Sequence, residues 1–398
     1  MKKIYYGKAV YDKKEINAVL NVLKNNSLSL IDGKKVKALE RKVSKIFGKK
    51  YGLMVNSGSS ANLLALSSFK FKKGSEIITP NLTFSTTVAP IYQLGLIPHF
   101  IGVEENKFVC DASQIEKCIN KKTVALMIPN LLGNIADWKK IYQIAKKHKL
   151  KIIEDSADTI GYTVHKKNLG KYSDITTNSF YASHIINGAG TGGIVCFNEY
   201  NLYEKAKLLR GWGRSSATFN ESENASKRFN VKISGIDYDA KYIFSDLGYN
   251  FLPSEISAAF ALEQVKKLKN NILMRNKNFQ YLTKFFKSYK DYLKLPEQNA
   301  GVKTPWLAFP LVIKKNKKFN RKKMQIFFEK RNIQTRTIFT GNILKQPVMK
   351  NRNYKKHTKC DKIANDVMKN GILLGCHQGM NKSELKYICS TFKKLIRE

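Results

Sequence analysis

Between residues 50 and 200, short apolar runs alternate with stretches of helical spacing, and this alternation constrains the fold more than any other feature. Apolar runs recur at 53–55, 76–78, 97–100, 124–128, 151–153 and 193–197. Between them, stretches such as 61–66 and 138–145 show the spacing of helices. Alternation of this kind predicts an α/β fold with a largely parallel sheet and helices on both faces. A ligand of such a sheet is expected at the carboxyl ends of its strands.

The chain is longer than one compact core usually holds, which predicts two domains. It has 398 residues, and domains of more than about 250–300 residues tend to divide. The sequence predicts a long helix over 255–290, a strand near 309–313, and helices near 319–330 and 360–369. We place the boundary near 266, with a large cofactor-binding α/β domain at 1–266 and a small α+β domain at 267–398.

A polar insertion and the overall charge bear on what the chain binds. Residues 215–240 lack apolar periodicity and are expected to form an inserted loop over the site. The formal net charge of +41 is compatible with nucleic-acid binding. However, lysine far outnumbers arginine, which is the preferred ligand of bases and phosphates, and the lysines spread over the whole chain. We therefore expect no nucleic-acid partner and a basic surface that attracts an acidic small substrate.

The sequence predicts a cytoplasmic protein without metal. It contains no run of about 18 apolar residues, and no apolar signal-peptide core follows the basic N-terminus. We therefore expect no membrane partner. The cysteines form no CxxC or CxC pair, so reduced thiols are expected in place of a zinc or iron–sulfur site.

Three segments at predicted strand ends carry candidate chemistry, although each also has a structural interpretation. Residues 56–62, of sequence NSGSSAN, follow a strand and open a helix, so they could hold a phosphate or form only a capped turn. Asp155 ends a strand and could pair with a pyridinium nitrogen or cap a helix. Phe84 could stack on a flat ring or fill the core.

The order of these elements is more specific than any one of them. After the phosphate turn, the aromatic residue and the aspartate comes Ser179, then His184 five residues later, and then a Gly-Gly pair at 192–193. In this order the chain resembles the DegT/DnrJ/EryC1/StrS family of fold-type-I pyridoxal-phosphate (PLP) enzymes, which remodel nucleotide-linked keto sugars. The segments 130–134, 340–342 and 375–378 resemble its histidine-bearing 3-dehydratase branch, the group of GDP-4-keto-6-deoxymannose 3-dehydratase.

The resemblance implies a fold-type-I PLP-transferase-like fold and a role for each matching residue. His184 is implied as the acid/base, where aminotransferases of this family carry the lysine that binds PLP covalently. Two arginines are the candidates for an anionic group of the substrate, Arg214 and Arg336. The implied cofactor ligands are Gly58, Ser59 and Ser179 for the phosphate, Phe84 on the ring, Asp155 at the ring nitrogen, Asp158 near the ring hydroxyl, and Asn250 reaching the cofactor of the neighbouring protomer in a homodimer.

A histidine in place of that lysine changes the expected reaction. An imidazole can move a proton near neutral pH but cannot tether PLP, so pyridoxamine phosphate (PMP) would bind loosely and favour elimination. The resemblance thus implies a PMP/PLP-dependent lyase that removes the 3-hydroxyl of a nucleotide-linked 4-keto-6-deoxyhexose, as in the deoxysugars of lipopolysaccharide O-antigens, with glutamate regenerating PMP.

Two other interpretations stay open at this point. An aminotransferase would need a lysine that reaches the cofactor, and no lysine lies between Lys171 and Lys205. A catalytically silent PLP-binding paralogue would not need Asp155. Within the 3-dehydratases, an iron–sulfur branch has cysteines where this chain has Ser215 and Ser216. The lengthened stretch 187–191 lies near the expected sugar site. Whether the nucleotide is GDP or CDP stays open.

Overall fold

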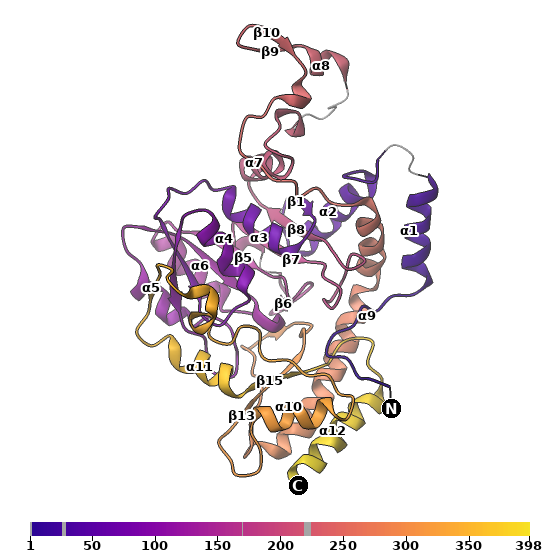
Figure 1. Ribbon diagram of the computed structural model, residues 1–398, viewed down its shortest axis with the longest axis vertical. Coiled ribbons are helices and arrows are strands. Elements are labelled where there is room, and N and C mark those ends of the chain that lie inside the picture. The colour runs from indigo at the N-terminus through magenta and orange to yellow at the C-terminus, as the bar shows by residue number, and fades with distance from the viewer. Residues whose placement is uncertain (1, 26–28, 169, 219–223) are drawn as a thin grey trace.

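The structure, a computed structural model, describes residues 2–25, 29–168, 170–218 and 224–398. A large sheet covered by helices forms the upper body, a smaller unit lies below it, and an arm projects from the top (Figure 1). The α/β sheet predicted from the apolar runs is confirmed.

The centre of the body is an eight-stranded sheet in the order β1-β8-β7-β5-β4-β2-β3-β14. β8 is antiparallel to β1 and β7, and the other neighbours are parallel. The apolar-run criterion does not identify β7, because its sequence is ITTNS. The strands are β1 (Tyr51–Val55), β2 (Glu76–Pro80), β3 (Ile97–Ile101), β4 (Thr123–Pro129), β5 (Lys151–Asp155), β7 (Ile175–Ser179), β8 (Gly193–Phe197) and β14 (Lys355–Lys356).

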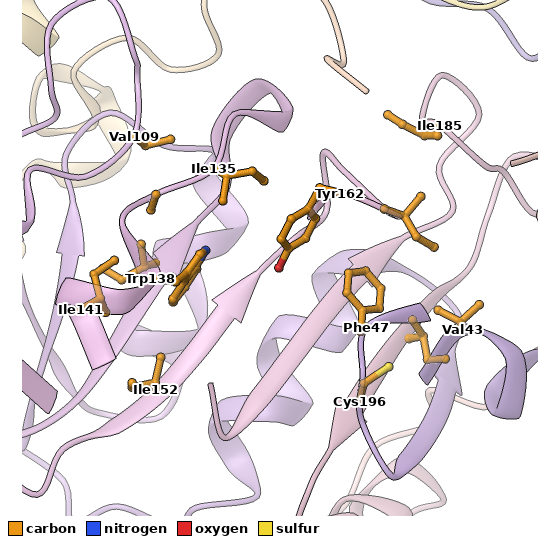
Figure 2. Packing of buried hydrophobic residues seen from close by; sticks show 14 of the residues in the cluster. Val43, Phe47, Val109, Ile135, Trp138, Ile141, Ile152, Tyr162, Ile185 and Cys196 are labelled. Atoms are coloured by element: carbon orange, nitrogen blue, oxygen red, sulfur yellow. The ribbon is translucent and has the colours of Figure 1, made fainter. Parts of the chain in front are cut away.

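Helices cover both faces of this sheet, and alternate strand residues supply the two cores. In β4, Leu126 and Ile128 pack with residues of α2 and α6, whereas Ala125 and Met127 pack with residues of α3, α4 and α7. Figure 2 shows the first of these cores, with Trp138 among its buried side chains. The helices of this body are α1 (Lys13–Asn25), α2 (Lys34–Ile46), α3 (Gly58–Ser67), α4 (Ser85–Gln93), α5 (Ile115–Cys118), α6 (Trp138–Lys147) and α7 (Tyr200–Arg210).

The smaller unit has its own sheet and its own apolar core. The sheet order is β11-β13-β15. Ile4 of the N-terminal segment belongs to this core, and its backbone N–H donates to the carbonyl of Asn332 (2.8 Å). The elements are α9 (Glu255–Phe286), β11 (Leu293–Lys294), β13 (Phe309–Ile313), α10 (Arg321–Glu329), α11 (Asp361–Asn370), β15 (Gly371–Leu374) and α12 (Lys382–Arg397), and a separate pair joins β6 (Thr163–Val164) to β12 (Val302–Lys303).

The two units are joined at several points. α9 is one continuous helix from Glu255 to Phe286, so the expected boundary at 266 lies inside it. β14, from the C-terminal half, pairs with β3 of the large sheet. The division into two domains at 266 therefore stays a prediction, because a helix and a strand cross between the units.

The insertion predicted near 215–240 forms a projecting arm, defined here as residues 215–247 apart from 219–223, which lie outside the described residues. It carries α8 (Ala225–Phe229), β9 (Val231–Ile233) and β10 (Ile236–Tyr238) and points away from the sheet (Figure 1). Its two legs are in backbone contact at the base, where a Cβ on Gly213 would lie 1.8 Å from the carbonyl oxygen of Asp246. The expectation of a loop over the site of its own chain is wrong, because no described arm residue lines the cavity found there.

Across the described ranges, no helix combines the length and the apolar character that a membrane crossing requires.

Candidate active site

A cavity of about 620 Å³ lies at the carboxyl ends of the central strands, where the sheet topology predicts a ligand. Its lining includes seven of the ten site residues predicted from the sequence. Those seven are Gly58, Ser59, Phe84, Asp155, Asp158, Ser179 and His184. The sequence therefore identified residues from four segments, 58–59, 84, 155–158 and 179–184, that meet at one place.

One end of the cavity is built by the first turn of α3. Ser57 is the N-cap, and its hydroxyl accepts from the backbone N–H of Ser60 (3.0 Å). A Cβ on Gly58 would lie 2.6 Å from the Cβ of Ser179, so only glycine lets α3 approach the end of β7 this closely. The backbone N–H groups of this first helical turn, with the hydroxyls of Ser59 and Ser179, provide the kind of donors that a phosphate requires.

Another part of the cavity wall carries Asp155, the last residue of β5. Its side chain is only 5% exposed. One carboxylate oxygen, Oδ2, accepts from Asn62 Nδ2 and Thr87 Oγ1, both at 2.8 Å. The other, Oδ1, accepts from the backbone N–H of Ala157 (3.1 Å). Burial raises the pKa of Asp155, although these three hydrogen bonds oppose the rise. A cation beside this carboxylate would therefore be stabilised strongly, as a protonated pyridine nitrogen would be.

His184 lies on the turn that follows β7 and faces the same cavity. Its Nδ1 lies 3.3 Å from the carbonyl oxygen of Ser179. Because a carbonyl only accepts, this contact requires the proton on Nδ1 and leaves the lone pair on Nε2. The pKa of His184 is lowered from 6.5 to about 4, mainly by burial; the Ser179 carbonyl opposes this shift and the charge of Arg275 contributes to it. At neutral pH this imidazole is uncharged and able to accept a proton.

Asp158 has a different environment from Asp155. Its Oδ2 accepts from the backbone N–H of Leu132 (2.8 Å). Burial raises its pKa to about 7, and the charge of Asp155 contributes to that rise. Leu132 has a φ of 59°, a left-handed conformation that is uncommon for a branched residue. Asp158 therefore holds the 130–134 turn against the cavity, and it can donate or accept a hydrogen bond near neutral pH.

Aromatic side chains close the side of the cavity that faces the smaller unit. Phe84 is 50% exposed, so it is not a core residue. Its ring meets that of Phe339 edge to face, with centroids 5.8 Å apart. Tyr6 of the N-terminal segment also lines this side. A planar ring could therefore stack on Phe84 with its second face toward the interior.

Three predicted residues lie outside this cavity. Arg336 lines a second cavity of about 500 Å³ that shares Tyr6, Phe84 and Phe339 with the first. Arg214 lies at the base of the arm, with its guanidinium 4.7 Å from the ring centre of Trp212. Asn250 is exposed and bridges to Gly211. Within one chain, the structure does not bring Arg214 and Asn250 to the cofactor cavity.

Sequence patterns did not identify four residues that shape the site. Asn62 and Thr87 hold Asp155, but both lie inside helices whose spacing only predicts packing. Tyr6 of the N-terminal segment and Phe339 of the smaller unit line the cavity with Phe84 only through the tertiary fold. A signal for Asn62 existed, because it directly precedes the apolar run 63–66 inside the helix, and the structure buries it to 2% exposure.

The residues present fit PLP or PMP. The donor-rich end can take the phosphate, the buried carboxylate can take the ring nitrogen, and Phe84 can take one face of the ring. Cavities of about 300–1,000 Å³ are typical of cofactor sites, and this one lies in that range. Within the described ranges, no group of three or more His, Cys, Asp or Glu side chains is arranged to bind a metal ion.

Comparison with known proteins gives a consistent result. Residues 10–393 match the DegT/DnrJ/EryC1/StrS aminotransferase family. The lipopolysaccharide biosynthesis protein RfbH of Salmonella typhimurium is 34% identical over 371 residues, which cover 90% of this chain and 84% of that protein.

Two solved structures resemble the whole fold. A variant of GDP-4-keto-6-deoxymannose 3-dehydratase with bound GDP-perosamine has a TM-score of 0.86 and 30% identity, covering 98% of this chain and 99% of that one. The same enzyme with a trapped PLP-glutamate geminal diamine has a TM-score of 0.86 and 29% identity, with the same coverage of both chains.

Proposed function

Because the chain belongs to the DegT/DnrJ/EryC1/StrS aminotransferase family, we propose that it is a PMP/PLP-dependent nucleotide-sugar 3-dehydratase. The observation that carries this proposal is the uncharged imidazole of His184 at the position expected for a lysine, in the cavity that holds Asp155. The resemblance to GDP-4-keto-6-deoxymannose 3-dehydratase supports the same reaction and a nucleotide-linked 4-keto-6-deoxy sugar as substrate.

Each residue has a defined task in this reaction. The first turn of α3 and Ser179 hold the phosphate, Phe84 stacks on the ring, and Asp155 keeps the ring nitrogen protonated. When bound, PMP supplies the amine that condenses with the C4 ketone of the sugar and a ring that accepts electrons as the 3-hydroxyl departs. His184 Nε2 accepts the proton from the C4′ carbon of the cofactor.

The overall balance separates this reaction from transamination. One 4-keto-6-deoxy sugar and one glutamate give one 3-deoxy-4-keto sugar, one 2-oxoglutarate and one ammonia. Glutamate is the proposed donor, in line with the glutamate adduct of the related structure. A transaminase would consume the same two substrates, retain nitrogen on the sugar and release no ammonia.

The site is proposed to be completed by a second copy of the chain. Asn250 is exposed on its own protomer and is assigned to the phosphate of the neighbouring cofactor. Arg214 and Arg336 are assigned to anionic groups of the substrate. The family resemblance implies a homodimer in which each active site takes residues from both protomers. Sedimentation of the purified protein would test this assembly.

The deciding experiment measures products and a variant of His184 together. The purified protein with PMP, glutamate and GDP-4-keto-6-deoxymannose, or the CDP-linked analogue, should release ammonia and 2-oxoglutarate in equal amounts. His184→Asn should lower this rate by about 10²–10⁴-fold, the usual effect of removing a positioned acid/base. An amino sugar formed without ammonia would contradict the proposal.

A further inference from the structure

Arg275, in the middle of α9, is a buried cation directly behind the turn of His184. Its side chain is 0% exposed. All five of its N–H groups have acceptors, and within the described ranges none of those acceptors is a carboxylate. A buried charge without an ionic partner costs free energy unless its surroundings offset it, so such a residue requires an explanation.

The five acceptors come from three separate segments. Nε donates to Gln378 Oε1 (2.7 Å) in the 375–378 segment. One terminal nitrogen donates to the carbonyls of Trp306 (3.1 Å) and Leu307 (3.0 Å). The other lies 3.4 Å from the carbonyls of Ser183 and of His184. The planar guanidinium is the side chain that can serve three directions at once, and a lysine ammonium has neither the reach nor the number of donors.

The 375–378 segment, which the sequence singled out without a role, is thereby connected to the site. Asn278, three residues after Arg275, donates to the carbonyl of His377 (2.8 Å). Gln378 accepts from Arg275 itself. Leu307 lines the cofactor cavity. One face of α9 therefore links the C-terminal unit, a wall of the cavity and the turn that carries His184.

The charge of Arg275 also acts on the two histidines near it. Burial is the largest cause of the low pKa of His184 and of His377, and Arg275 lowers both further. The other titratable groups that line the cavity with His184 are Tyr181 on its own turn, Tyr6 of the N-terminal segment, and the two aspartates Asp155 and Asp158.

We propose that Arg275 is a positioning residue for the dehydration, which holds the main chain of Ser183 and His184 from behind and places a fixed positive charge behind the turn that carries the imidazole. Gln378 orients the guanidinium while leaving its charge uncompensated. The inference rests on the proposed role of His184. The experiments below distinguish a failure of this inference from a failure of that role.

The sharpest test is Gln378→Glu. A carboxylate at position 378 still accepts the hydrogen bond from Arg275 Nε, and it adds a negative charge beside the guanidinium. This charge neutralises the positive charge of Arg275, which disfavours the protonated form of His184. The acid limb of the kcat–pH profile should move up by about one pH unit. Carbon-13 histidine NMR of the cofactor-free protein should show the same rise for His184, a readout that does not depend on turnover.

Gln378→Met is the matched control, because it removes the acceptor without adding a charge. It should leave the acid limb in place and lower kcat by about threefold to tenfold through a looser guanidinium. If Gln378→Glu shifts neither the limb nor the His184 titration, the proposed electrostatic role is wrong.

Arg275→Lys and Arg275→Met test the main-chain contacts. Both should lower kcat by about 10- to 100-fold, since small displacements of a catalytic group have effects of this size, while the dissociation constant for PMP, measured by fluorescence titration, changes less than about twofold. Unchanged kcat in a folded Arg275 variant overturns the inference. If these variants do not fold, the Gln378 pair decides it.

A double variant separates this inference from the proposed function. If Arg275 acts through His184, Arg275→Lys should lower the rate no further once His184→Asn is present. Additive losses would mean that Arg275 acts elsewhere. Near-normal activity of His184→Asn alone would instead overturn the proposed function, whatever Arg275 does.

Discussion

The two ends of the cofactor cavity are built in different ways. At the Asp155 end, a strand terminus and two neighbouring helices supply three hydrogen bonds to one carboxylate, all within the large sheet body. At the His184 end, a contact of 3.3 Å to the Ser179 carbonyl and an edge-to-face contact with Tyr181 hold the ring, and the turn behind it depends on Arg275 and the smaller unit. The first end is held entirely within the large sheet body, whereas the second depends on how the two units pack together.

The largest effect should come from Asp155→Asn, which tests the end held within the sheet body. A neutral amide has no charge to hold a pyridinium, so turnover should fall by about 10³-fold or more. Because burial raises the pKa of Asp155, the charged carboxylate costs stability once the pH rises above its unfolded pKa. The free energy of unfolding of the cofactor-free variant, from urea titration at pH 7, should therefore be no lower than that of the wild type. A folded variant with near-normal turnover would show that the ring nitrogen is paired elsewhere.

The next largest effect should come from replacing the imidazole by an amine at the His184 end of the cavity. His184→Lys should capture added PLP covalently, so that the PLP absorbance band survives gel filtration and borohydride gives a stable adduct on residue 184. Formation of the 3-deoxy product should fall together with this capture, because a tethered cofactor is not delivered as PMP. Wild-type protein, treated in the same way, should lose its PLP. Equal dehydration rates in the two proteins would show that the histidine does not select elimination.

A smaller effect is expected from one hydrogen bond at the Asp155 end. Thr87→Val removes the hydroxyl that donates to Asp155 at 2.8 Å, and the turnover rate should fall by about tenfold, the effect of roughly 1.4 kcal/mol. Thr79→Val is the matched control, since the buried hydroxyl of Thr79 has no hydrogen-bond partner within the described residues. Equal turnover rates for the two variants would mean that the Thr87 hydroxyl contributes nothing through its hydrogen bond to Asp155.

The smallest effect is a pH dependence of stability at the His184 end. The pKa of His377 is lowered by burial from 6.5 to about 4, and that of His184 is lowered to a similar value. The unfolded chain therefore binds more protons between these values, so stability present above pH 6.5 is lost as the pH falls toward 4. The slope for His377 should be at most about 1.4 kcal/mol per pH unit.

Urea titrations at several pH values would measure this slope. His377→Gln should flatten it, and the exposed His165→Gln should leave it unchanged. An identical slope in wild type and His377→Gln would show that the contact of His377 with the Tyr5 carbonyl (3.2 Å) is not sensitive to protonation.

The strands with apolar runs and the order of the site motifs could be predicted from the sequence, because both depend on residues close together in the chain. Period and length are sufficient to identify β1 to β5 and β8, and the spacing from Ser179 to His184 places both at the end of one strand. β7 was the exception, since its Ile-Thr-Thr-Asn-Ser sequence is buried by neighbours on both sides and not by its own apolarity.

By itself, the sequence determined which groups are available for chemistry: a helix start proposed for a phosphate, Asp155 proposed for a ring nitrogen, and an imidazole at 184, where the family resemblance implies an amine in aminotransferases. Only the tertiary structure decided how these groups are held. Asn62, Thr87 and Arg275 act across 93, 68 and 91 positions of the chain, and no local pattern encodes a contact at that separation. The arm illustrates the same limit, because its composition predicts an exposed segment while its direction is set by the backbone contact of Gly213 with Asp246.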